Sequence, residues 1–179
     1  KTSLESVLSK RLTFVEDGNY NENRYFKAAL AFKQFIDNNL QSYLALFSKS
    51  ASPNDSNFDS SKLEQLFNYI AQEKGIKYES EMFVRLDSNN FDEQKSLLLK
   101  GLSAGERRFI LSTYATLGAG QNLQYDIPSN RENDVVKIND LRTKKEMDIE
   151  GIYLDKPTSI INKCGGDEKN TINRVFQME

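Results

Sequence analysis

The sequence lacks histidine altogether and contains one cysteine, Cys164, among its 179 residues. Without histidine, no Ser–His or Cys–His nucleophile pair can form. The same scarcity argues against a zinc site, since zinc in proteins is bound mainly by cysteine and histidine. A single cysteine excludes an internal disulfide, so we expect Cys164 to be an inert thiol in a reducing cytoplasm.

Long apolar runs and an excess of charge of one sign are also absent. No run approaches the roughly 18 apolar residues that a membrane helix needs, and no signal peptide is visible. The chain has 24 basic and 26 acidic residues, a net charge of −2. Nucleic-acid binders commonly carry a basic field, so the net charge does not support nucleic-acid binding. It does not exclude a domain that contacts phosphates only locally.

The spacing of apolar residues predicts alternating helices and strands. The first predicted helix covers residues 23–36. The second is capped by Ser60 or Ser61 and ends near Gly75. The third follows Asp87 and ends at Gly105. Predicted strands cover residues 43–47, 81–86, 109–111 and 149–154. Residues 40–48 could instead extend the first helix, but an apolar run between polar turns favours a buried parallel strand. Residues 126–147 are polar, and we expect them to be irregular.

This alternation predicts an α/β fold with a mainly parallel sheet and helical crossovers. We divide the chain into a helical segment, residues 1–39, and an α/β domain, residues 40–179. We interpret the aromatic stripe at Tyr25, Phe26, Phe32 and Phe35 as core or as an interface with a missing neighbour, and not as a platform for base stacking. Arg107 and Arg108 are expected to form a solvated strand entry, with a phosphate clamp as the alternative.

The most informative segment runs from Arg107 to Gln124. A buried strand at residues 109–111 leads into two hydroxyl residues, Ser112 and Thr113, and the glycines Gly118 and Gly120 follow before Asn122. Ligands of α/β proteins bind at the carboxyl ends of the strands. Glycine permits close approach of the backbone to a phosphate.

This segment resembles motif V of superfamily-two helicases and translocases, in which a strand ends in Ser-Thr or Thr-Thr and a Gly-x-Asp/Asn element follows. The order of elements over residues 40–160 is similar to that of the second RecA-like domain of these motors. The resemblance implies a RecA-like three-layer sandwich, here with an N-terminal helical extension. It also implies that Ser112 and Thr113 bind nucleic-acid phosphates, and that Gly118, Gly120 and Asn122 line the nucleotide cleft.

The same resemblance implies which partners and cofactors are needed. ATP and magnesium would bind only together with the first RecA-like domain of the same polypeptide, and DNA is favoured over RNA as the nucleic acid. The sequence contains no Gly-x-x-x-x-Gly-Lys-Ser/Thr loop, so this chain alone should not hydrolyse ATP. No arginine-finger motif follows the last strand. Since the chain starts at Lys1 and stops at Glu179, we interpret it as a fragment of a larger protein.

Two other interpretations stay open. Gly118 and Gly120 could form the loop of a Rossmann-like domain that binds a nucleotide or a methyl donor. The third glycine of that pattern is replaced by Leu123, and no strand ending in an acidic residue follows at the usual distance. The chain could also be a non-catalytic protein-interaction module that docks through its N-terminal helices.

Overall fold

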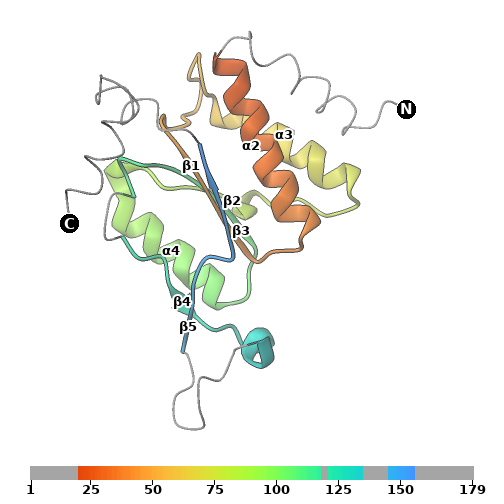
Figure 1. The fold of residues 1–179 in the computed structure, drawn as a ribbon, viewed down its shortest axis with the longest axis vertical. Helices are drawn as coiled ribbons and strands as arrows, with labels where there is room; N and C mark the ends of the chain where they lie inside the picture. The colour runs from red at the N-terminus through yellow and green to blue at the C-terminus, as the bar shows by residue number, and fades with distance from the viewer. Residues whose placement is uncertain (1–19, 118–120, 135–144, 156–179) are drawn as a thin grey trace, which may run out of the picture.

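The computed structural model describes residues 20–117, 121–134 and 145–155 (Figure 1). The α-helices are α2 (Tyr20–Asp37), α3 (Ser60–Glu73) and α4 (Phe91–Ser103). The strands are β1 (Ser42–Phe47), β2 (Phe83–Arg85), β3 (Arg108–Thr113), β4 (Tyr125–Asp126), β5 (Glu146–Met147) and β6 (Gly151–Leu154). The 3₁₀ helices are η1 (Ser80–Met82), η2 (Ser88–Asn90) and η3 (Ser129–Asp134). The predicted alternation of helices and strands is confirmed. Residues 1–19 of the predicted helical segment and Cys164 lie outside the described residues.

Four parallel strands form the main sheet in the order β2-β3-β1-β6. Helices α2 and α3 cover one face of this sheet and α4 covers the other (Figure 1). The predicted fold class is therefore confirmed: the domain is an α/β three-layer sandwich, the arrangement shared by RecA-like and Rossmann-like domains. Strands β4 and β5 form a separate antiparallel pair.

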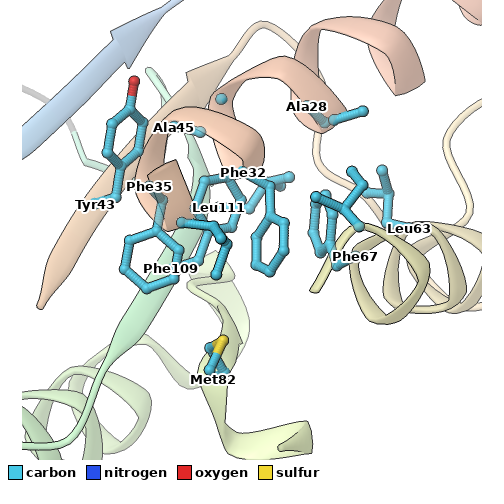
Figure 2. Close-up of a cluster of buried hydrophobic side chains, with 14 of the residues drawn as sticks. Ala28, Phe32, Phe35, Tyr43, Ala45, Leu63, Phe67, Met82, Phe109 and Leu111 are labelled. Carbon is cyan, nitrogen blue, oxygen red and sulfur yellow. The ribbon is translucent and has the colours of Figure 1, made fainter. Parts of the chain in front are cut away.

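The face under α2 and α3 is packed with aromatic rings (Figure 2). The ring of Phe109 lies 5.2 Å from Phe32, 5.2 Å from Phe67, 5.8 Å from Phe35 and 5.7 Å from Tyr43, measured between centroids. Phe32 also stacks on Phe67 at 4.4 Å. The prediction of a core role is confirmed for Phe32 and Phe35, while Tyr25 is partly buried and packs against this core.

The opposite face has a smaller, aliphatic core. From α4, Leu98 and Leu102 pack with Ile110 of β3, and Leu123 and Tyr125 of the connection after β3 join them. The side chains of this aliphatic core do not cover β6, where Ile152 and Leu154 are 56% and 58% exposed. The second face is thus covered less completely than the first.

Capping residues explain where helix α3 begins and where helices α3 and α4 end. The sequence pointed to Ser60 or Ser61 as the cap of α3, and this was wrong: Asp59 is the N-cap, and its carboxylate accepts a hydrogen bond from the Ser61 amide at 2.9 Å. A carboxylate is a strong acceptor for the free amides of a first turn. Gly75 and Gly105 follow the two helices with φ of 68° and 87°, values that favour glycine.

Several predicted boundaries need correction. Strand β2 is shorter than residues 81–86, because η1 precedes it and the Met82 amide donates to the Glu79 carbonyl at 2.9 Å. Strand β6 begins at Gly151 and not at residue 149. The connection at residues 126–147 was expected to be irregular, but β4, β5 and η3 form part of it.

Arg107 lies at the amino end of the sheet and binds the end of α2. Its guanidinium donates to the carbonyls of Leu40 at 2.9 Å and Phe35 at 3.2 Å, and it covers the Phe35 ring at 4.7 Å. Burial lowers the pKa of Arg107, with a partly opposing effect of Glu150. The expectation of a solvated strand entry was wrong for Arg107, because its half-buried side chain binds the carbonyls of Phe35 and Leu40 at the end of α2.

Candidate functional site

The carboxyl ends of all four parallel strands meet at one edge of the sheet. In the register, Phe47 of β1 lies opposite Thr113 of β3, and Leu46 of β1 lies opposite Leu154 of β6. The hydroxyl residues at the end of β3 therefore lie at this edge, next to the end of β1, as the sequence predicted. This is the edge at which α/β sheets bind ligands.

Ser112 uses its hydroxyl inside the sheet. The side chain is 1% exposed, and its Oγ donates to the Leu86 carbonyl at 2.9 Å. This bond joins the end of β3 to the residue that follows β2. Ser112 is thus held away from solvent, with its donor already engaged.

Thr113 organises the turn that follows β3. Its Oγ1 accepts a hydrogen bond from the Thr116 amide at 3.1 Å and lies 3.0 Å from the Thr116 hydroxyl. The Leu117 amide donates to the Thr113 carbonyl at 3.0 Å. These bonds make residues 113–117 a compact turn, here called the β3 turn. A threonine that bonds forward in this way favours a turn over continued strand.

The remaining predicted site residues follow the β3 turn. Gly118 and Gly120 lie outside the described residues. Asn122 is exposed, and its Nδ2 donates to Gln124 Oε1 at 2.6 Å. The structure therefore brings Ser112 and Thr113 to one edge, while Asn122 belongs to a different hydrogen-bonded group.

Asn122 lies at the wall of a groove of about 340 Å³ on the face that α4 covers. Its lining is mainly aliphatic, and the polar members are Gln121, Asn122 and Asp148. Its lining consists of Leu44, Leu46, Leu117, Gln121, Asn122, Leu123, Asp148, Ile149 and Ile152. Gln124 donates to Asp148 at 2.6 Å, so amide and carboxylate groups beside the groove bind one another.

Asp155, directly after β6, was missed as a site residue. Its side chain is 2% exposed, and Oδ1 lies 2.6 Å from Lys27 Nζ of α2. The Tyr114 hydroxyl donates to the Asp155 carbonyl, which connects the β3 turn to the end of β6. An acidic residue immediately after a predicted strand was the available signal, since such positions gather at the carboxyl edge.

Charged groups at the ends of β1 and β2 are paired with one another. Asp87 accepts a hydrogen bond from the Ser50 hydroxyl at 2.8 Å, and its other oxygen is 3.6 Å from Arg85. Arg85 also donates to the Ala51 carbonyl at 2.7 Å. Lys49 pairs with Asp55 at 2.9 Å. These cations are partly neutralised, which agrees with the balanced net charge.

Burial keeps the tyrosines at this edge in the neutral, hydrogen-donating form. It raises the pKa of Tyr114, and the charge of Asp155 raises it further. Burial likewise raises the pKa of Tyr153, whose hydroxyl lies 3.5 Å from Asp155 Oδ1. Both effects disfavour a phenolate beside a carboxylate.

Within residues 20–117, 121–134 and 145–155, no group of three or more acidic, cysteine or histidine side chains could hold a metal ion. Each helix in the part of the chain that the structure describes is too short or too polar to cross a membrane.

Comparison with models of known protein families gave no match, and comparison with curated proteins gave none either. The fold and the contacts at the carboxyl edge are therefore the basis for assigning a function.

Proposed function

We propose that this chain is the second RecA-like domain of a superfamily-two helicase or translocase that acts in the cytoplasm. In this proposal it supplies contacts to nucleic-acid phosphates and one wall of an ATP cleft, and it is inactive alone. The observation that carries the proposal is the position of Ser112-Thr113. The pair ends β3 at the carboxyl edge beside β1, and a compact turn leads from it toward Asn122.

The hydrogen bonds of the β3 turn suggest which groups would bind a phosphate. Ser112 Oγ is engaged by the Leu86 carbonyl, so the contact would fall to the neighbouring threonines. Thr113 and Thr116 share one hydrogen bond between their hydroxyls. Each hydroxyl has one hydrogen, so the pair keeps a second hydrogen that one of them can donate. Such a contact would position nucleic acid without reading its sequence.

The ATP cleft would need a second lobe. Asn122 is exposed beside the groove and would face the nucleotide from this domain. The first RecA-like domain of the same polypeptide would supply the phosphate-binding loop and the magnesium ligands, so turnover would require closure of the two lobes. DNA is the nucleic acid we propose, and no membrane contact is part of the proposal.

The coding sequence on either side of this chain provides the first test. We expect a phosphate-binding Gly-Lys-Ser/Thr loop upstream and an arginine-rich motif downstream. The isolated chain should show no ATP turnover and little nucleotide binding in calorimetry. Tight binding of a nucleotide or a methyl donor by the isolated chain would contradict the proposal and favour a Rossmann-like enzyme.

One observation favours a second candidate, a protein-interaction module. Ile152 and Leu154 are exposed on β6, and in the described residues this strand pairs only with β1. An apolar edge strand without charged residues can pair with another chain. A stable complex that survives Gly120→Ala but is lost in Ile152→Glu would favour this module over the motor domain.

A further inference from the structure

The ends of β3 and β6 are joined across the end of β1. Strand β1 lies between them in the sheet, so a side chain from one end must pass β1 to reach the other. Tyr114 makes this connection. Its amide donates to the Phe47 carbonyl of β1 at 3.3 Å, and its hydroxyl donates to the Asp155 carbonyl beyond β6.

Asp155 is itself held from two sides. Its amide donates to the Leu46 carbonyl of β1 at 2.9 Å. Its buried carboxylate binds Lys27 Nζ at 2.6 Å, which attaches it to α2. A buried carboxylate that loses its cation is strongly destabilised, so Lys27 keeps Asp155 in this place.

The β3 turn is closed by internal hydrogen bonds. Thr113 Oγ1 accepts from the Thr116 amide, and the Thr113 carbonyl accepts from the Leu117 amide. Tyr114 belongs to this turn, and its ring reaches out to Asp155. The backbone bond of Tyr114 to Phe47 holds the turn to β1, and the far end of the Tyr114 side chain adds a second attachment, to β6.

We propose that Tyr114 is a positioning residue: through Asp155 and Lys27 it fixes the β3 turn to α2 and β6. The contacts of the turn with nucleic acid rest on the proposed function, whereas the link itself does not. If the larger protein works as proposed, a shift of β6 or α2 would be transmitted to the threonines that bind the phosphate. Tyr114 would act on these threonines without touching the ligand.

Tyr114→Phe in the full chain tests this link, because it removes only one oxygen atom. We expect hydrogen exchange at the Thr116 and Leu117 amides to rise at least about fivefold, since both bonds report local opening of the turn. Exchange at the Ile110 and Leu111 amides in β3 should not change. Tyr69→Phe is the matched control, because Tyr69 is 50% exposed on α3. Unchanged exchange at Thr116 and Leu117, or an equal rise throughout β3, would overturn the proposal.

A double-mutant cycle tests whether the link passes through Asp155. Lys27→Met removes the cation, and its effect on exchange of the turn should be strongly non-additive with that of Tyr114→Phe. Additive effects would overturn this route. Lys77→Met is the control, since Lys77 is 86% exposed and pairs with Glu79.

Binding of a single-stranded oligonucleotide by the protein with both lobes separates this inference from the proposed function. If the wild type binds, Tyr114→Phe should weaken binding several-fold with only a small loss of thermal stability, and unchanged affinity would contradict a positioning role. If the wild type does not bind, the proposed function fails. The exchange measurements then still decide whether Tyr114 holds the turn.

Discussion

At the scale of single residues, Asp55 shows how one carboxylate holds the loop after β1. Its Oδ1 accepts hydrogen bonds from Lys49 at 2.9 Å, the Asn57 amide at 2.7 Å and the Phe58 amide at 2.9 Å. The Lys49 hydrogen bond contributes most, and together they lower the pKa of Asp55 from 3.8 to about 2. A lowered pKa means that the ionised form stabilises the folded state.

The resulting stability is present above pH 3.8 and lost as the pH falls through about 2. We expect stability to decline over this interval in the wild type, with a smaller decline in Asp55→Asn. Carboxyl-detected NMR titration measures the pKa of Asp55 directly. Acid unfolding of the wild type and of Asp55→Asn measures the loss of stability. Asp126→Asn, at an exposed position, is the control. Titration of Asp55 at its ordinary pKa would contradict the loop geometry.

Ser112 offers a second test at the residue scale. Its buried hydroxyl satisfies the Leu86 carbonyl, and removing it leaves a buried acceptor without this partner. We therefore expect Ser112→Ala to lower the free energy of unfolding by about 1–3 kcal/mol. Urea unfolding measures the effect, and Ser96→Ala on the exposed side of α4 should be nearly neutral. Unaltered stability in Ser112→Ala would show that the hydroxyl is free for another role.

The sequence placed the two hydroxyls correctly at the carboxyl edge but could not divide their roles. Ser112 binds a carbonyl 26 positions away, a contact that only the pairing of β2 with β3 creates. Thr113, one residue later, bonds locally within its own turn. Asp155 and Lys27 are 128 positions apart, so no local pattern could have joined them.

At the scale of elements, Phe109 connects β3 to both helices of the aromatic face. Its fully buried ring contacts Phe32 and Phe35 of α2 and Phe67 of α3. We expect Phe109→Ala to cost about 3–5 kcal/mol, the range for removing a large buried aromatic side chain. Chemical unfolding measures it, and Leu97→Ala, at a 65% exposed position of α4, should cost far less. Similar losses in both variants would contradict this core.

The same contacts explain which elements the sequence revealed. Residues 43–47 and 109–111 form unbroken apolar runs, because both faces of these strands are buried. Helix α2 has aromatic residues at helical spacing, because one of its faces meets the sheet. The two-residue strands β4 and β5 are too short to produce any periodic signal. The Asp59 cap was missed because two serines beside it are equally common caps.

At the scale of the whole molecule, buried tyrosines make stability dependent on alkaline pH. Burial raises the pKa above 10.0 for Tyr43, Tyr78, Tyr114, Tyr125 and Tyr153. The unfolded chain therefore ionises first as the pH rises. The stabilisation is complete below pH 10 and is lost as the pH climbs through the folded-state values.

We expect cooperative alkaline unfolding, in which most tyrosinate absorbance appears together with the loss of tertiary structure. Near-ultraviolet absorbance and circular dichroism, recorded on the same samples, check whether the two changes coincide. Ionisation of these five tyrosines near their ordinary pKa, with the fold intact, would contradict the burial described for them.

The proposed motor function also belongs to the scale of the whole molecule, because both lobes are needed for it. Its most direct test is nucleic-acid-stimulated ATP hydrolysis by the protein that contains this domain and its partner lobe. Thr113→Val preserves the shape of the side chain and removes the hydroxyl that organises the β3 turn. We expect the DNA-stimulated rate of ATP hydrolysis at subsaturating DNA to fall about tenfold, the effect of one lost hydrogen bond to a charged group. The DNA-independent rate of ATP hydrolysis should not change. Equal stimulation in wild type and Thr113→Val would contradict the assignment of this edge to nucleic acid.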